Sequence, residues 1–249
     1  MLISTNQFIY ANNSTLEITK PLENEISYNT FSELPNSQHD IIFNNDVLSN
    51  PLLENIADKI IITEITNNKH SNLQGTITIK GTTADLIITN PNGNSWKNGK
   101  TDNIKSLSLI AGKLEIAEDK TLSQLKSLKF ITTIASSINL NDNRENSFAT
   151  NNPANIKAKI NIAKLNLFAD KIIINDNIIL AATGAISYSL YQASIKLKNL
   201  IKPDTNLTYL HHSQFKLAQQ AIIKGQDIIL ESHPYQCSNN YSCKKIIFK

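Results

Sequence analysis

The chain has 249 residues, of which 41% are hydrophobic and 18% charged, so it is long enough to bury one large core or two smaller ones. Its 24 Lys and Arg residues nearly balance its 21 Asp and Glu residues, and Arg144 is the single arginine, which together argue against a nucleic-acid partner. No apolar run approaches the roughly 20 residues of a membrane-spanning helix, and no signal peptide is visible at the N-terminus.

The first third of the chain predicts short strands separated by polar turns. Residues 59–65 form an apolar run typical of a buried strand, and residues 75–81 place Ile77 and Ile79 on one face. Residues 44–46 (Asn-Asn-Asp) predict a turn, since Asn and Asp close turns with their own side chains. We therefore expect the chain to begin as an all-β protein.

A tetrapeptide of strong turn formers, Asn90-Pro91-Asn92-Gly93, directly follows the apolar run at residues 84–89. Pro91 has a fixed φ and lacks an N–H, which suits the first central position of a turn, and Gly93 tolerates a positive φ. The Asn90 side chain is expected to accept the backbone N–H two residues on. We predict that this tetrapeptide ends one strand and redirects the chain into the next. On its own it is typical of a turn with no further role.

From residue 105 onward, apolar residues recur in pairs at positions i and i+2, a period that marks a strand with one buried face. The intervals between pairs are about five to seven residues, too short for helical crossovers between parallel strands. Two architectures fit this periodicity equally: a β-sandwich, and a right-handed, single-stranded parallel β-helix whose coils stack their inward side chains. The pairs are Leu107/Leu109, Leu114/Ile116, Leu128/Phe130, Ile138/Leu140, Ile160/Ile162, Leu165/Leu167, Ile172/Ile174 and Ile178/Leu180.

Two segments break this strand pattern. Residues 142–155 are polar, contain Pro153 and predict a protruding excursion. Residues 211–224 place Phe215, Leu217 and Ile222 near helical spacing and predict a short helix. The apolar residues of this region fit strands equally well.

Several motifs resemble the N-terminal secretion domain of two-partner secretion exoproteins, the family of filamentous haemagglutinins, haemolysins and contact-dependent growth-inhibition proteins. That family carries an Asn-Pro-Asn-Leu element and, further on, an Asn-Pro-Asn-Gly-Ile element. Residues 50–53 (Asn-Pro-Leu-Leu) resemble the first, and residues 90–94 (Asn-Pro-Asn-Gly-Asn) resemble the second. The chain departs from the family at Leu52 and Asn94. Trp96 and Gly99 stand where many growth-inhibition relatives have a Cys-x-x-Cys pair.

The resemblance implies a parallel β-helix with an N-terminal cap at residues 1–35, a β-helix secretion domain at 36–200 and a C-terminal extension at 201–249, with short antiparallel excursions. It implies a monomeric, non-enzymatic protein without cofactor, secreted by or displayed on a Gram-negative bacterium. Its partner would be an outer-membrane transporter of the two-partner secretion type, which recognises the domain while its β-helix nucleates folding during export. The turns implied to be recognised, or to define the fold, comprise Asn50, Pro51, Asn90, Pro91, Asn92 and Gly93.

Other functions also fit the fold. A short structural or adhesive surface protein, or a truncated remnant without a transporter, would carry the same strand pattern. A β-helix polysaccharide-active enzyme would need clustered carboxylates, either for Ca²⁺ or as an acid–base pair, whereas the Asp and Glu residues here are scattered.

The cysteines and aromatic residues carry weaker signals. Cys237 and Cys243 bracket a short polar loop and form a candidate disulfide in an oxidising compartment. His233 lies nearby, but a closed zinc site would lack its fourth ligand, so no metal is expected. The aromatic residues expected to serve in packing are Trp96, Phe130 and Phe168.

Overall fold

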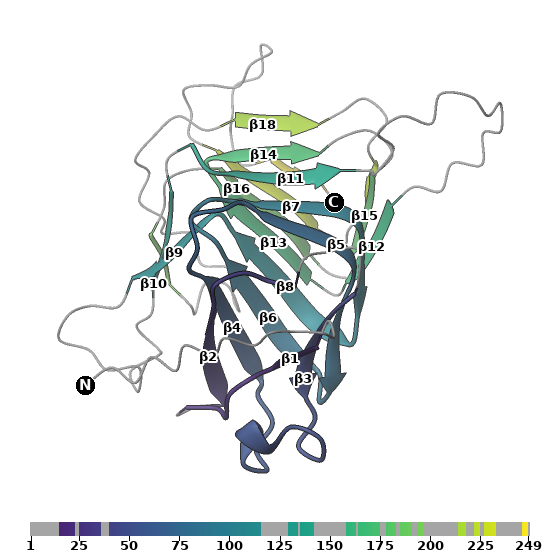
Figure 1. Ribbon diagram of the computed structural model, residues 1–249. Coiled ribbons are helices and arrows are strands. Elements are labelled where there is room, and N and C mark those ends of the chain that lie inside the picture. The colour runs from purple at the N-terminus through teal and green to yellow at the C-terminus, as the bar shows by residue number, and fades with distance from the viewer. Residues whose placement is uncertain are drawn as a thin grey trace, which may run out of the picture.

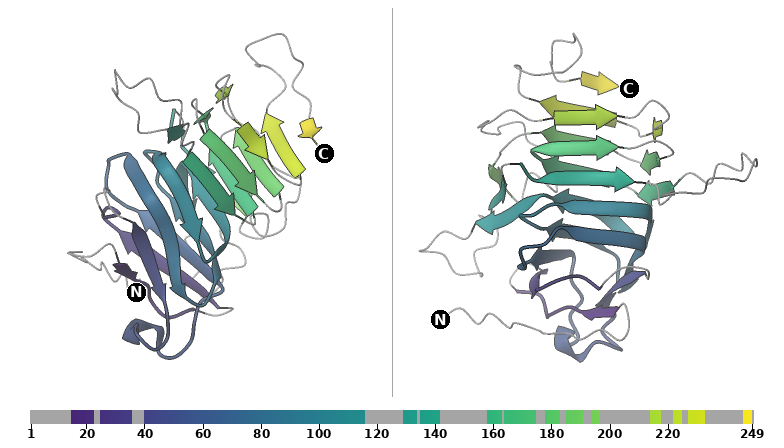
Figure 2. Two further views of the ribbon diagram at one scale, coloured as in Figure 1. Left: turned by 90° about the vertical axis from the view of Figure 1, so that its right-hand side faces the viewer. Right: turned by 45° about the horizontal axis from the view of Figure 1, so that its top comes forward.

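The computed structural model describes a parallel β-helix, in which one chain winds into stacked coils whose strands form sheets along the axis (Figures 1 and 2). The described residues are 15–22, 25–35, 40–115, 129–133, 135–141, 158–162, 164–174, 178–182, 185–190, 194–196, 214–217, 222–224, 227–232 and 246–248. Within them the chain is almost entirely β-strand, with one 3-10 helix, η1 (Pro51–Leu53). The predicted parallel β-helix is confirmed.

Two large sheets hold most of the strands. The seven-stranded sheet contains, in spatial order, β1 (Thr15–Glu17), β3 (Ile41–Asn45), β5 (Ser71–Gly81), β7 (Asn94–Asp102), β11 (Ser137–Asn141), β14 (Lys171–Ile174) and β18 (Gln214–Leu217). The eight-stranded sheet contains β2 (Ile26–Phe31), β4 (Ile60–Ile65), β6 (Ala84–Thr89), β8 (Ile104–Ile110), β13 (Lys164–Ala169), β16 (Ala185–Leu190), β20 (Asp227–Ser232) and β21 (Ile246–Phe248).

The early coils alternate between these two sheets. β3 leads to β4, β4 to β5, β5 to β6 and β6 to β7, and each strand pairs in parallel with the next strand but one. This pairing excludes the β-sandwich alternative, because strands joined as hairpins run antiparallel. A third parallel sheet gives the later coils a further side, along the right of Figure 1; it contains β12 (Ala158–Ile162), β15 (Ile178–Ala182) and β19 (Ile222–Lys224).

Aliphatic side chains fill the coil in columns that run along its axis. The register of the eight-stranded sheet places Ile61, Leu86, Leu107 and Leu165 at one level of successive coils, and each is at most 1% exposed. Burial of each such side chain stabilises the fold by about 1.5–3 kcal/mol. Every member of the predicted i, i+2 pairs whose side-chain burial the structure describes is buried. Trp96, Phe130 and Phe168 are also buried, which confirms their predicted packing role.

Part of the outer face of the eight-stranded sheet is buried as well. An antiparallel sheet of β9 (Gly112–Glu115), β10 (Lys129–Thr132) and β17 (Ser194–Lys196) interrupts the coil. Leu114 and Phe130 from this sheet form a second apolar cluster with residues that point outward from the coil: Ile26, Ile62, Ile87, Ile110 and Phe168.

A polar link fastens the same antiparallel sheet to the coil. One Glu64 carboxylate oxygen accepts the Leu114 N–H at 3.3 Å, and the other accepts the Tyr28 hydroxyl proton. Burial and the Glu64 charge raise the pKa of Tyr28 well above its usual range. Tyr28 therefore stays protonated and keeps donating to Glu64 throughout the physiological pH range.

Three predictions about segments need correction or comment. The helix predicted at residues 211–224 is wrong: β18 and β19 lie there, and β18 pairs in parallel with β14, with Phe215 opposite Ile172 in the register. The turn predicted at residues 44–46 begins later, because Asn44 and Asn45 end β3 with buried side chains. Parallel strands also run across the predicted boundaries at residues 35 and 200, and the division into a cap, a secretion domain and a C-terminal extension stays a prediction.

Candidate functional site

The first Asn-Pro element, the Asn50 corner (residues 50–53), turns the chain from β3 toward β4. The side chain of Asn50 is 1% exposed. Its Oδ1 accepts the Leu52 N–H at 3.0 Å, and its Nδ2 donates to the carbonyl oxygens of Ile18 and Asn44, both at 2.8 Å. The Asn50 carbonyl accepts the Leu53 N–H at 3.3 Å. One buried amide therefore joins three separate backbone segments.

The second element, the Asn90 corner (residues 90–93), turns the chain from β6 into β7 and is also fully buried at its asparagine. Asn90 Oδ1 accepts the Asn92 N–H at 2.8 Å, as predicted, and its carbonyl accepts the Gly93 N–H at 3.0 Å. Asn90 Nδ2 donates to the Lys69 carbonyl at 3.0 Å and to the Ser71 hydroxyl at 2.6 Å. Gly93 has φ of +93°, a conformation that residues with a Cβ rarely adopt.

The two corners use the same hydrogen-bonding scheme at different places. In each, the asparagine Oδ1 accepts the backbone N–H of the residue two positions on, and the proline between them has no N–H that would need an acceptor. The asparagine Nδ2 donates to a carbonyl oxygen of an earlier coil and so fastens the turn to it. The Asn50 corner leaves the seven-stranded sheet and the Asn90 corner enters it, so they lie at different edges of the coil. The predicted residues thus form two structural clamps rather than one site.

His70 holds the Asn90 corner from the preceding coil, and the sequence analysis missed it. Its Nδ1 lies 2.9 Å from the Asn92 carbonyl oxygen and its Nε2 lies 2.8 Å from the Ser95 hydroxyl. A carbonyl oxygen only accepts, so Nδ1 carries a proton. A Cβ on Gly93 would lie 3.0 Å from the His70 ring and 2.4 Å from the Ser137 carbonyl oxygen of the following coil. The position of His70, about one coil before the Asn90 corner in the sequence, is the feature that could have indicated this role.

The two departures from the family pattern, Leu52 and Asn94, lie in different environments. The turn uses the backbone N–H of Leu52, so its side chain is free to be apolar and is 38% exposed. Asn94 lies in the inward column beside Ser71 and Ile138 and is fully buried. Its Nδ2 donates to the Ile110 carbonyl at 3.3 Å, while its Oδ1 has no hydrogen-bond partner.

Trp96 and Gly99 make a contact where many growth-inhibition relatives have a Cys-x-x-Cys pair. A Cβ on Gly99 would lie 2.5–2.8 Å from atoms of the Trp96 ring, so only glycine leaves room for the indole. The Trp96 side chain is 2% exposed and its register partners are Leu73 and Leu140. This chain has no cysteines at these positions, and aromatic packing closes the same stretch of β7.

At the other edge, Asn45 fastens the start of β4 to the end of β3. Its Oδ1 accepts the Asp58 N–H at 2.8 Å, and its Nδ2 donates to the carbonyl oxygens of Asp58 and Thr82 at 2.9 and 2.8 Å. The Asp58 carboxylate is fully buried, and neither oxygen has a hydrogen bond of good geometry. Burial raises the pKa of Asp58 to about 7, although the nearby Ser27 hydroxyl lowers it somewhat.

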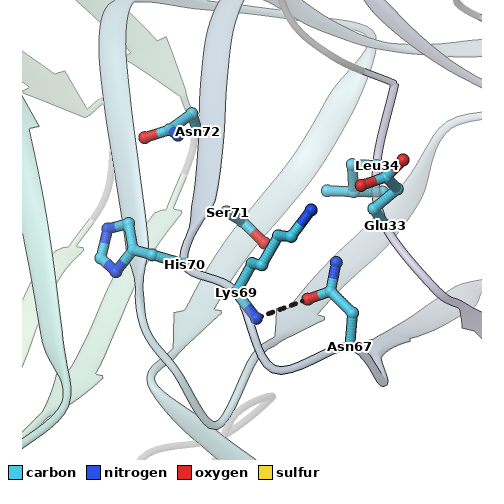
Figure 3. A pocket seen from close by; sticks show the side chains of 7 residues that line it. All are labelled: Glu33, Leu34, Asn67, Lys69, His70, Ser71 and Asn72. Carbon is cyan, nitrogen blue, oxygen red and sulfur yellow. Dashed lines mark hydrogen bonds between the residues drawn. The ribbon is translucent and has the colours of Figure 1, made fainter.

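A shallow pocket of about 160 Å³ lies beside the Asn90 corner (Figure 3). Glu33 and Lys69 lie on its wall, and the Lys69 N–H donates to Asn67 Oδ1 at 2.9 Å. The His70 side chain points away from Glu33 and Lys69, in keeping with its bonds to the corner. Pockets that enclose small ligands are typically larger and more apolar, so this pocket is a surface depression between turns.

Some predictions lie outside the described residues. These are the Cys237–Cys243 disulfide and the excursion at residues 142–155. Among the described residues, no group of three or more His, Cys, Asp or Glu side chains is placed to hold a metal ion. In that same part of the chain no helix is long and apolar enough to cross a membrane.

Comparisons with known proteins agree with this geometry. The filamentous hemagglutinin of Bordetella pertussis is 32% identical over 109 residues, which cover 39% of this chain and 3% of that protein. The crystal structure of the filamentous hemagglutinin secretion domain superposes with a TM-score of 0.62 at 17% identity, over 87% of this chain and 72% of that one. Residues 4–231 match the family described as the TPS secretion domain. The chain therefore belongs to the family of two-partner secretion domains, the export modules of filamentous-haemagglutinin-like exoproteins.

Proposed function

We propose that this domain is recognised by an outer-membrane transporter of the two-partner secretion type and folds into its β-helix as it leaves the cell. The observation that carries the proposal is the family match over residues 4–231, together with the two buried Asn-Pro corners. The exoprotein would be secreted or held on the surface of a Gram-negative bacterium. The domain itself would be a non-enzymatic monomer.

The corners support a role in starting the β-helix. Each coil of such a fold contacts only its neighbours, so a stable early coil provides the edge on which the next coil pairs. Asn50 fastens the turn after β3 to the Ile18 carbonyl near β1, and Asn90 fastens the turn after β6 to Lys69 and Ser71 of the preceding turn. These bonds exist only when consecutive coils are stacked. They therefore couple formation of one coil to formation of the next.

Two of the described carboxylates, Asp85 and Glu64, support a non-enzymatic role. Asp85 accepts from the Ser106 hydroxyl and lies 3.5 Å from Lys105 Nζ, and Glu64 holds Tyr28 and the Leu114 backbone. A glycosidase needs two carboxylates that face one substrate across a cleft. Here these carboxylates take part in bonds that hold strands together.

A secretion assay tests the proposal. The chain would be expressed with the outer-membrane transporter that exports it, and the amount in the culture medium measured by quantitative immunoblot. Asn50→Ala and Asn90→Ala should each lower secretion by about tenfold or more, because each leaves two buried acceptors and a turn N–H without a partner. The matched control is Asn72→Ala at an exposed position of β5. Unchanged secretion of both corner variants, or secretion without the transporter, would refute the proposal.

A further inference from the structure

The last strand of the eight-stranded sheet runs in the opposite direction to its neighbour. β21 pairs antiparallel with β20, with Ile247 opposite Ile229, whereas the other pairings between the named strands of this sheet are parallel. Figure 2 shows β21, in yellow beside the C-terminus, at one end of the coil stack. A further coil of a parallel β-helix would have to pair in parallel with β20 at this place. β21 is therefore a return strand and not the first strand of another coil.

β21 covers the part of β20 that is most prone to pair with another strand. β20 has six residues, and Ile228, Ile229 and Leu230 form an uninterrupted apolar run in it. The register of β21 spans these same three positions. An uncovered edge with such a run is a template on which further strands can pair. The return strand thus lies where β20 would otherwise offer that template.

The strands that end the sheets at this side of the stack are short and rich in lysine. β18 ends the seven-stranded sheet with four residues that include Lys216, and β19 ends the third parallel sheet with three residues that include Lys224. β21 has three residues, and in the sequence Lys245 precedes it and Lys249 follows it. Short edge strands and lysines discourage further pairing. β21 therefore replaces a six-residue edge with a shorter one between lysines.

The charges of the two segments favour β21 over a second copy of β20 as the strand at this edge. Asp227 and Glu231 flank the apolar run of β20. Opposite them, β16 has Ala185 and Ser189, which carry no charge. A second β20 aligned on the same run, in either direction, would set acidic residues opposite acidic residues, and this destabilises strand pairing. The segment at residues 245–249 is complementary instead, because its apolar run has basic ends.

We propose that β21 closes the coil stack: it occupies the edge of β20 and blocks the addition of any other strand there. The edge is a site for a short extended segment with a basic–apolar–basic sequence, and the chain supplies that segment itself. Backbone hydrogen bonds would provide the affinity of such a strand addition, and the flanking charges its selectivity. The inference rests on the fold and is independent of the transporter.

Strand complementation in the full-length chain tests the inference. One variant carries Ile246→Asp, Ile247→Asp and Phe248→Asp together, which frees the edge of β20. The matched control is Lys216→Asp on β18, an edge strand of the other large sheet. The probe is a fluorescent peptide with the sequence of residues 244–249, and a second peptide has its three lysines replaced by glutamate. Fluorescence anisotropy measures binding, and amide hydrogen exchange measures the protection of β20.

The amides of β20 should exchange about tenfold or more faster in the triple variant than in the unmodified chain, and Lys216→Asp should leave them unchanged. The basic peptide should bind the triple variant at least about tenfold more tightly than the unmodified chain, because the edge of the unmodified chain is already occupied. The acidic peptide should bind neither chain measurably, since it would set glutamates opposite Asp227 and Glu231.

Unchanged exchange of β20 in the triple variant would overturn the inference, because β21 would then not cover that strand. Equal binding of the basic peptide to both chains would overturn it as well, since the edge would be open without any substitution. If the triple variant unfolds at lower urea, Lys245→Glu combined with Lys249→Glu decides instead. This pair keeps the apolar run and should speed exchange of β20 by at least about threefold; no change would refute the inference. A failed secretion assay would leave all these results unaffected.

Discussion

The buried carboxylate of Asp58 makes the stability of this domain depend on pH in a direction opposite to that of most acidic residues. Burial raises the pKa from 3.8 to about 7 in the folded state. Between these two values the folded chain binds a proton that the unfolded chain has released, so the free energy of unfolding falls as the pH rises. The pKa difference corresponds to at most about 4 kcal/mol, which is fully present below pH 4 and lost by about pH 7.

Urea unfolding followed by circular dichroism at about pH 5 and about pH 8 measures this effect. The control is Asp58→Asn, which keeps the shape of the side chain and removes its proton equilibrium. Asp46 does not confuse the comparison, because hydrogen bonds from Ser49 and Leu48 lower its pKa and it is ionised throughout this range. We expect the unmodified chain to lose about 2–3 kcal/mol from pH 5 to pH 8 relative to the variant. An identical pH dependence in Asp58→Asn would refute the reasoning.

Three further substitutions test the packing. Asn94→Ile should raise the free energy of unfolding by about 1–2 kcal/mol, because it removes a buried oxygen that has no hydrogen-bond partner. The Ile110 carbonyl keeps its bond from the Asn90 N–H. A lower free energy of unfolding in urea would contradict this expectation. Gly93→Ala should cost about 3 kcal/mol or more in the same assay, since its Cβ meets the adjacent coils; a neutral effect would contradict the backbone geometry. Phe130→Ala should lower the free energy of unfolding by about 3–5 kcal/mol. It should also speed amide hydrogen exchange more in β9 than in β6. An equal increase of the exchange rate in both strands would contradict a separate outer cluster.

The period-two pattern predicted the strands well because burial of one face leaves a local trace in the sequence. Leu107 and Leu109, or Ile172 and Ile174, need no knowledge of their partners to be recognised as inward residues. The same locality explains the error at residues 211–224. Phe215 and Leu217 fit helical and strand spacing alike over so short a segment, and pairing with β14 of the preceding coil decided between them.

The corner residues could be predicted only in part. The bond from the Asn92 N–H to the Asn90 side chain lies within four residues and follows from turn chemistry. The bonds from Asn90 to Ser71 and from His70 to Asn92 join residues about one coil apart, and the coil length was not known from the sequence. The burial of Ile62 and Ile87 on the outer face was also hidden, because it depends on an inserted sheet that covers them.

The packing of Trp96 over Gly99 has a consequence for the proposed export through a transporter pore. A disulfide between these positions would close a small ring before transit, and the pore would have to admit two backbone segments side by side. Packing of the Trp96 indole on Gly99 needs no covalent cross-link, so the polypeptide stays linear until the tertiary structure forms. Reductants and thiol-oxidising enzymes should therefore have no influence on whether this stretch of β7 reaches its native shape.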